Sequence, residues 1–247
     1  MKQAQQIRLL QLLNHIAVIV GLTFAFYGYA TLLLYSIVIG IVFSVVGINI
    51  AYHRYLAHQS FQTYPIIEKI LLLVGCLCLV GSPLAWAVSH INHHAYADKD
   101  GDPYSPNRIK LWDFLMTRFE PVKHQRLGLS RLLKNKTVMV LHNNYLKIIG
   151  VYCLVLCIFN PLFVIYFWCI PSVIVLYLLL ATNIVCHLTG YRNHNTDDLS
   201  QNSIVMSILT LGEGWHNNHH ANPSKWAQGE RWFEFDPTAW IIRLIKT

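Results

Sequence analysis

Nine histidines lie in four short segments of this chain, at spacings that suit metal binding. The chain has 13 histidines in 247 residues, and the four segments, here called the histidine boxes, read HRYLAH, HINHH, NIVCH and HNNHH. The second and fourth boxes place histidines at positions i, i+3 and i+4, which lie on one face of a helix. Each of these two boxes is therefore expected to direct its three imidazoles at one locus. The nine residues are His53, His58, His90, His93, His94, His187, His216, His219 and His220.

The first and third boxes space their residues differently. His53 and His58 are five residues apart, which corresponds to roughly 140° around an α-helix. We expect this pair to straddle a site and to reach two different metal ions more easily than one. In the third box, Asn183 and His187 are four residues apart and share one helix face. His187 is therefore a candidate ninth ligand, although it lacks the spacing of the larger boxes.

Bound metal ions would explain why so many imidazoles are gathered. Clustered imidazoles repel one another when they are protonated, and they are costly to bury without partners. Imidazole binds iron, zinc, copper and nickel alike, and one zinc ion needs three or four ligands. Nine histidines are too many for one ion and suit two. Because the boxes contain no carboxylate, the sequence favours iron and the activation of oxygen.

Two long apolar stretches must position these boxes. Hydrophobic residues make up 54% of the chain and charged residues 13%, and the mean hydropathy is +0.39, a composition unlike that of a soluble domain. The first stretch, Leu9 to Tyr52, breaks weakly at Gly28–Tyr29, and the second, Tyr145 to Thr189, breaks at Asn160–Pro161 and Pro171. About 20 helical residues cross a bilayer, so each stretch can form two spans. The predicted spans lie near 9–28, 30–52, 145–165 and 171–189.

The sequence thus predicts an all-α membrane protein, a single domain over residues 1–247, with four transmembrane helices in two hairpins. The segment near 66–86 is also apolar, but Glu68 and Lys69 stand near its start, and glycines and a proline interrupt it. A fifth span there would place the later boxes on the opposite side of the membrane. We expect this segment to lie in the membrane interface.

The basic residues indicate which side carries the boxes. Two hairpins put the N-terminus, the 53–144 region and the 190–247 tail on one face, which then holds all 19 Lys and Arg residues. Short loops rich in Lys and Arg are cytoplasmic, so we expect a cytoplasmic helical cap that carries the histidine boxes and the active site. No basic run is interleaved with exposed aromatics, so the net charge of +7 does not indicate nucleic-acid binding.

At the boxes the chain resembles the membrane fatty acyl desaturases, specifically the Δ9 acyl-CoA or acyl-lipid type. The resemblance rests on HRYLAH, HINHH and GEGWHNNHH, on the DKDGDPYSP run, and on Gly190-Tyr191-Arg192 with the residues that follow it, which are similar to the bacterial branch. It covers roughly residues 30–240. The chain departs from the family pattern at His194 and over Lys110–Leu141. His15, His124, His142 and His194 lie outside the boxes and are expected to take no part in the site.

The resemblance implies a cofactor, a substrate and partners. The nine box histidines would bind two iron ions, Asn183 would hold a metal-bound water, and Trp86 would help to shape a tunnel for the acyl chain. The reaction would use dioxygen and two electrons, delivered by a separate donor such as a ferredoxin or a b-type cytochrome with its reductase. The substrate would be a saturated long-chain fatty acyl group, and the location a bacterial inner membrane. The acyl carrier stays open among CoA, acyl carrier protein and a glycerolipid.

Two other functions fit some of these features. Related di-iron membrane hydroxylases and monooxygenases also have histidine boxes, although their spacings and flanking residues differ, and product analysis would distinguish an alcohol from an olefin. A metal transporter places ionisable ligands within its spans, whereas all the boxes here lie at or beyond the ends of the predicted spans. The run GEGWHNNHH favours desaturation.

Overall fold

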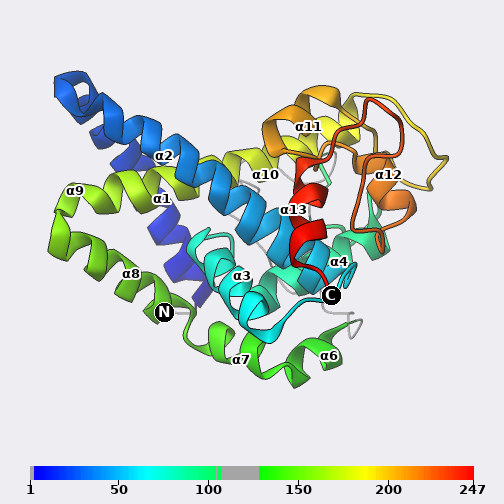
Figure 1. The fold of residues 1–247 in the computed structure, drawn as a ribbon, viewed down its shortest axis with the longest axis horizontal. Helices are drawn as coiled ribbons and strands as arrows, with labels where there is room; N and C mark the ends of the chain where they lie inside the picture. The colour runs from blue at the N-terminus through cyan, green and yellow to red at the C-terminus, as the bar shows by residue number, and fades with distance from the viewer. Residues whose placement is uncertain (1–2, 104, 107–127) are drawn as a thin grey trace.

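The computed structural model describes residues 3–103, 105, 106 and 128–247. Within these residues the fold is all-helical, and extended pairing is limited to isolated bridges between Thr63 and Lys246, Tyr191 and Asn202, and Asn202 and Trp215. Figure 1 shows long helices gathered at one end of the molecule and shorter helices at the other.

The first apolar stretch forms a helical hairpin. Helix α1 (Gln3–Phe24) and the short segment η1 (Ala25–Tyr29) lead to α2 (Ala30–Val42) and to η2 (Phe43–Ala57), a π-helix. Tyr27 and Gly28 leave the helical conformation, and Gly28 has φ +110°, which glycine adopts without a steric cost. The chain reverses there, at the dark-blue tip in Figure 1, which confirms the predicted break.

The second apolar stretch breaks at one place only. Helix α8 (Tyr145–Phe159) ends at Asn160, and the helix then runs through α9 (Pro161–Val164), η3 (Ile165–Cys169) and α10 (Ile170–Leu188) without a further break. The prediction that a second helix begins only at Pro171 is therefore wrong. Proline leaves the carbonyl four residues earlier without its helical donor, and that carbonyl, of Phe167, accepts a hydrogen bond from the hydroxyl of Tyr152 at 3.2 Å. The preceding π-turn and this bond accommodate the proline.

Two helical runs among the described residues are long and apolar enough to cross a membrane. They are Gln3–Ala57, which contains the turn at Gly28, and Pro161–Leu188. A bent pair, α7 (Lys136–Asn143) and α8, meets at 67° and would supply a third run if it acts as one span. The chain is thus a membrane protein by length and composition of its helices.

The segment predicted to lie in the interface consists of two helices rather than one. Helix α3 (Pro65–Leu77) and α4 (Pro83–Tyr96) are separated by a turn in which Leu79 has φ +56° and Gly81 has φ +116°. The Ser82 side chain accepts a hydrogen bond from Ala85 N at 3.3 Å and caps α4, and Pro83 occupies its first turn, where proline is favoured.

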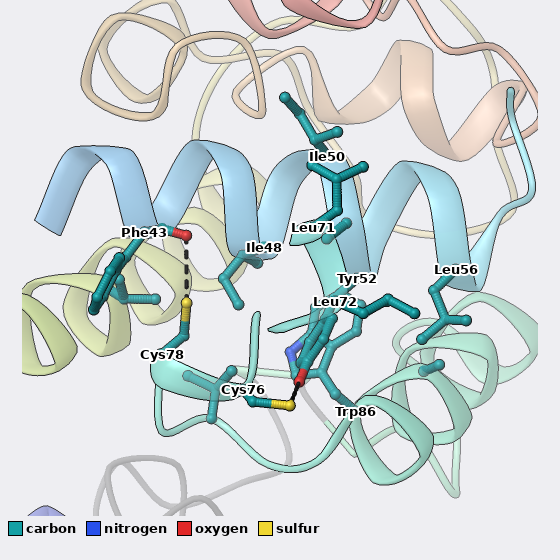
Figure 2. Packing of buried hydrophobic residues seen from close by; sticks show 14 of the residues in the cluster. Phe43, Ile48, Ile50, Tyr52, Leu56, Leu71, Leu72, Cys76, Cys78 and Trp86 are labelled. Atoms are coloured by element: carbon teal, nitrogen blue, oxygen red, sulfur yellow. Dashed lines mark hydrogen bonds between the residues drawn. The ribbon is translucent and has the colours of Figure 1, made fainter. Parts of the chain in front are cut away.

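The core lies where η2 packs against α3 and α4 (Figure 2). Tyr52 of η2 is fully buried, and its hydroxyl contacts Cys76 Sγ at 3.6 Å, while Cys78 Sγ contacts the carbonyl of Phe43 at 3.3 Å. A side chain at Gly75 would collide with the Tyr52 ring, so this glycine allows the close approach. These contacts fix η2 against α3, and the Tyr52 ring also lies 5.8 Å from the Trp86 ring of α4, so the two box-bearing elements η2 and α4 are held together.

The remaining helices are short and belong to the end of the molecule that holds the boxes. They are α6 (Leu129–Lys134), α11 (Ile204–Thr210), α12 (His216–Ala221) and α13 (Pro237–Ile245). The C-terminus is held against the start of α3, because Thr247 N donates to Gln62 O at 3.0 Å and Thr63 Oγ1 donates to Ile245 O at 2.6 Å.

Candidate metal centre

All nine box histidines meet in two neighbouring groups. In each group one nitrogen from every member lies within 4.8 Å of the corresponding nitrogens of the others. The two groups contact each other, for example where the rings of His94 and His220 lie 4.4 Å apart. The five-histidine group consists of His53, His58, His90, His94 and His219, and the four-histidine group of His93, His187, His216 and His220.

Each three-histidine box serves both groups, which corrects the expectation that a box points at one locus. In α4, His90 and His94 belong to the five-histidine group, and His93 belongs to the other. In α12 the assignment is reversed, because His216 and His220 join the four-histidine group and His219 the other. The i and i+4 side chains stay together, whereas the i+3 side chain turns toward the neighbouring group. Both helices therefore lie beside both groups.

The expectation that His53 and His58 reach different metal ions is also contradicted. Both belong to the five-histidine group, and their ring centroids are 4.9 Å apart. The reason is that η2 is a π-helix whose hydrogen bonds join residues five apart, as in the bond from His58 N to His53 O at 3.1 Å. Such bonding brings residues i and i+5 nearly above one another, which an α-helix does not.

Four of the histidines are oriented by carboxylates. Each donates its Nδ1–H to one acidic side chain. The pairs are His53 with Glu213 at 2.5 Å, His93 with Asp102 at 2.8 Å, His187 with Asp98 at 2.9 Å and His220 with Asp198 at 2.7 Å. A metal-binding histidine commonly makes this hydrogen bond, which fixes its tautomer and the direction of its ring.

The opposite nitrogens of these rings are arranged as ligands. His53 Nε2 lies 2.9 Å from His219 Nε2, and His187 Nε2 lies 3.0 Å from His216 Nε2. In the tautomer that donates from Nδ1 alone, His53 and His187 each present a lone pair at Nε2. Among the described residues, the buried Nε2 of His220 has no hydrogen-bond partner. Convergent lone pairs without protons between them suit a cation, so both groups fit a metal ion.

Burial favours the neutral form of six of the nine box imidazoles. It is the largest cause that lowers the pKa of five of them well below the usual value near 6.5, and neighbouring histidines lower the pKa further. Burial also lowers the pKa of His220, to about 4, although the Asp198 carboxylate acts in the opposite direction. Neutral imidazole is the form that binds metal. The five histidines with a pKa well below 6.5 are His58, His90, His94, His216 and His219.

Two of the orienting carboxylates, Glu213 and Asp198, have a lowered pKa and are ionised. Burial alone would raise the pKa of Glu213, but the charge and hydrogen bonds of His53 and Arg54 outweigh it and hold the pKa at about 2. Burial opposes ionisation of Asp198 as well, and hydrogen bonds from His220 and two hydroxyl groups bring its pKa below the usual range. These groups supply negative charge close to each histidine group, which favours a bound cation.

A buried arginine connects this centre to the C-terminal tail. Arg54 is 1% exposed, and it donates two hydrogen bonds to Glu213 Oε1, at 3.0 and 2.7 Å. It also donates to Asp236 Oδ2 and to the carbonyl of Trp226, both at 2.8 Å. Arg54 therefore holds the carboxylate that orients His53, and it ties the tail to the same point.

The two asparagines inside the last box fasten the surrounding loops. Asn217 Oδ1 accepts hydrogen bonds from the backbone N–H groups of Asn193 and His194, both at 2.8 Å. Asn218 Nδ2 donates to Glu234 Oε2 at 2.8 Å, and Asn202 Nδ2 donates to Asn218 Oδ1 at 2.8 Å. The box thus combines metal-type ligands with residues that hold α12 in place.

Sequence reasoning did not assign roles to Arg54, to the asparagines in the last box, or to the orienting carboxylates. The signal available for the carboxylates was their position, since Asp98 and Asp102 follow the second box closely and Glu213 precedes the last box. A histidine ligand commonly needs an acceptor for its other nitrogen. Asp198 and Asp236 carried no such local signal, because they approach the site only through the fold.

A largely apolar pocket adjoins both histidine groups. Its polar lining includes His53, His90 and His216, and its apolar walls come from η2 and α10. Trp86 lies in its wall, 2% exposed, and stacks on the His90 ring with centroids 4.8 Å apart. Asn183 also lines the pocket, and its Nδ2 donates to Leu179 O at 2.9 Å. A pocket with mostly apolar walls and a few polar groups at one end suits an apolar ligand.

Histidines outside the boxes take other partners. Within the described residues, His15 Nδ1 bonds to Gln11 O at 2.7 Å, His142 Nδ1 to Ser82 Oγ at 2.6 Å, and His194 Nε2 to Glu230 Oε2 at 2.7 Å. None of these three belongs to either histidine group. His124, and most of the 110–141 segment that departs from the family pattern, lie outside the described residues.

Comparison with known proteins agrees with this site. The sequence model described as "Fatty acid desaturase" matches residues 27–243. The chain is 34% identical to the sn-2 palmitoyl-lipid 9-desaturase of Nostoc sp. (strain 36) over 83% of this chain and 75% of the relative. It is 32% identical to Delta-9 acyl-lipid desaturase 1 of Arabidopsis thaliana, over 81% and 68%, and 31% identical to the Acyl-CoA C20 Delta5-desaturase of Anemone leveillei, over 82% and 67%.

The family match covers most of the chain and includes all four boxes. The two histidine groups, the carboxylates that orient them and the adjoining apolar pocket lie within the matched residues. This chain belongs to the fatty acid desaturase family and is a membrane-associated oxidoreductase.

Proposed function

We propose that this protein is an O2-dependent desaturase that introduces a cis double bond, at the Δ9 position, into a saturated long-chain fatty acyl substrate. The observation that carries the proposal is the placement of two convergent histidine groups beside one apolar pocket. Two of the relatives described above are named as acyl-lipid 9-desaturases, which supports the Δ9 position and a lipid-linked substrate. The Δ5 acyl-CoA relative keeps the acyl carrier open.

The nine box histidines would hold two iron ions, one in each group. Bound there, a di-iron centre would supply the activation of dioxygen, with two electrons from a donor, for the removal of two hydrogens from adjacent methylenes. In balance, –CH2–CH2–, O2, two electrons and two protons give –CH=CH– and two water molecules. Asn183 would add a hydrogen bond through a metal-bound water. The protein's own part is to bind, orient and exclude solvent.

The pocket determines which carbon atoms react. Its apolar walls, including Ile48, Val175 and Leu179, would hold the acyl chain by contact alone, since methylenes offer no hydrogen bonds. Trp86 would form part of the tunnel and limit how the chain bends past His90. Close placement of the reacting atoms supplies much of the rate enhancement in enzymes, so the depth of the pocket would set the double-bond position.

For the topology we keep four spans: those near 9–28 and 30–52 as predicted, and Tyr145–Phe159 with Pro161–Leu188 in place of the predicted 145–165 and 171–189. Both termini and the histidine boxes would lie on the cytoplasmic side of a bacterial inner membrane. This orientation would expose the centre to a separate electron donor, either a ferredoxin or a b-type cytochrome with its reductase. The one-sided distribution of Lys and Arg supports it.

Expression in a host that lacks unsaturated fatty acids tests the proposal. The lipids of cells that express the parent chain should contain cis Δ9 olefins, and those of cells that express His93→Ala should not, because that variant loses a ligand of the four-histidine group. Alcohols in place of olefins would show a hydroxylase. Unchanged lipids, from parent protein that carries its full metal content, would refute the proposal.

A further inference from the structure

Helix α11 exposes apolar side chains and buries polar ones, the reverse of a helix on the surface of a water-soluble protein. Its outward side chains are Ile204, Val205, Ile208 and Leu209, which are 50 to 68% exposed. The side chains that it buries include Ser207 and Thr210, each 3% exposed. A helix on a soluble protein turns its apolar stripe inward, so the solvent for the outer face of α11 must be apolar.

Helix α13 shows a related pattern. One face packs toward η2, with Thr238, Ala239 and Ile242 buried. The opposite face is also apolar, since Trp240 is 60% exposed and Leu244 is 84% exposed. Apart from Arg243 the exposed side of α13 is apolar, and contiguous exposed apolar surface marks contact with a membrane or another protein. Nothing among the described residues covers this face.

The two helices present these faces from adjoining positions. Thr238, at the start of α13, donates from Oγ1 and from N to the carbonyl of Leu211, at 2.7 and 3.1 Å, just after the end of α11. Helix α11 packs on α10, and α13 packs on η2, which are the ends of the two long apolar helical runs. Figure 1 shows α11 and α13 near the box-bearing ends of those helices.

We propose that α11 and the exposed face of α13 lie in the cytoplasmic interface of the bilayer and form a lipid-contacting collar around the entrance of the apolar pocket. The occupant of this surface is membrane lipid. Exposed Arg243 follows Trp240 by three residues in α13, and the ammonium of exposed Lys246 lies 5.0 Å from the Trp226 ring. Basic residues with tryptophan are typical of the headgroup level, where they attract lipid phosphates. The collar continues the surface of the spanning helices.

The collar would also define the path by which an acyl substrate enters the pocket, an inference that rests on the proposed function. Thr210 of α11 lines the pocket, and its carbonyl accepts a hydrogen bond from Asn49 of η2 at 2.8 Å. Helix α11 is thus the wall between the lipid-facing surface and the pocket. An acyl chain would pass from the membrane into the pocket beside this helix without crossing water.

Spin-label accessibility in single-copy nanodiscs tests the collar. Labels are placed at Leu244→Cys and Ile208→Cys, with Ser224→Cys as the control on an exposed polar loop. The background carries Cys153→Ser and Cys157→Ser, since the other four cysteines are buried. Variants whose metal content equals that of the parent are compared. The collar labels should show a higher ratio of O2 to water-soluble nickel-chelate accessibility than the Ser224 label.

Equal ratios at all three positions would overturn the collar. Low accessibility of the collar labels to both probes would also overturn it, because it would show that a segment of this chain covers the surface. A high accessibility ratio in concentrated detergent solution that disappears in single-copy nanodiscs would overturn it too, because it would show contact with a second copy. The measurement does not depend on turnover. A chain that fails to desaturate fatty acids could still place its collar in lipid, so the two failures are distinguishable.

Discussion

At the scale of single residues, the centre depends on groups that belong to neither histidine group. Glu213 joins His53 to Arg54, and Arg54 joins both to Asp236. A buried charge is costly unless it is paired, so each member of this chain requires the others. The same logic holds for Asp198, which orients His220 and also accepts hydrogen bonds from Thr196 and Ser200.

Glu213→Gln is expected to weaken the centre without removing a ligand. The amide cannot accept from His53 and Arg54 as a carboxylate does, so metal affinity or activity should fall by about 10–100-fold. Metal affinity is measured by competition with a chelator. Glu230→Gln is the matched control, because Glu230 pairs with Lys225 and His194 away from both groups. Equal losses in the two variants would show that the effect is not specific to the centre.

His187→Ala and Asn183→Ala should separate a ligand from its neighbour. His187 belongs to the four-histidine group, so its loss is expected to abolish desaturation and to lower iron occupancy. Asn183 lines the pocket but donates to Leu179 O, and its loss should reduce activity by about 10–100-fold while most of the metal is retained. Lipid unsaturation and iron content are measured at matched expression. Near-parental unsaturation in His187→Ala would remove His187 from the site.

The sequence was sufficient to choose these residues but not to distribute them. Spacing and the family resemblance together predicted nine histidines, and all nine lie in the two groups, while their binding of metal stays a prediction. Their division into groups of five and four could not be predicted, because it depends on how α4 and α12 approach each other. The shared group of His53 and His58 depends on the π-helical hydrogen bonds of η2, for which the sequence carries no local signal.

At the scale of helices, glycine determines how closely η2 and α3 pack. A Cβ at Gly75 would meet the Tyr52 ring, whereas a Cβ at Gly150 of α8 would meet nothing within 4 Å. Tyr52 is the residue before His53, so strain at this contact would reach the five-histidine group. The sequence showed Gly75 only as an interruption of an apolar segment.

Gly75→Ala should destabilise the protein by about 1–3 kcal/mol, as overpacking of a filled core does. Gly150→Ala should be neutral or slightly stabilising, since it only reduces the freedom of the unfolded chain. The midpoint of thermal unfolding in detergent compares the two variants. A Gly75→Ala protein as stable as Gly150→Ala would show that η2 and α3 are not packed as closely as described.

Proline illustrates why helix boundaries were predicted only in part. Asn160–Pro161 does end α8, and the Asn160 side chain caps the next helix by accepting from Leu162 N at 2.9 Å. Pro171 follows Ile170, which has no capping side chain, and the hydroxyl of Tyr152 satisfies the carbonyl that this proline frees. The missing cap was a local signal, whereas the partner of the carbonyl comes from another helix and depends on the tertiary fold.

At the scale of the whole molecule, the proposed topology places both hairpin turns on the outer face. Accessibility reporters inserted at Gly28 and at Pro161 should give the outer signal, because neither turn carries a basic residue. A reporter after Thr247 serves as the control and should give the cytoplasmic signal. A cytoplasmic signal at either turn would contradict the four-span arrangement.

The stability of the metal-free protein should depend on pH in a defined direction. Burial holds six histidines below their usual pKa, with His220 at about 4. Between about pH 6.5 and pH 4, the unfolded chain takes up protons that the folded chain does not, so stability falls as pH falls. Glu213 loses its stabilising charge only as pH falls below about 4.5, toward its pKa of about 2. A melting temperature that stays constant from pH 7 to pH 5 would contradict this account.

The metal content of purified, active protein tests the central claim most directly. Two groups of histidines, each able to hold one ion, predict two iron ions per chain by elemental analysis. Because zinc also accepts imidazole ligands, overexpressed protein that carries zinc should be inactive until iron replaces it. Full desaturase activity in protein that holds a single metal ion per chain would contradict the two-metal centre.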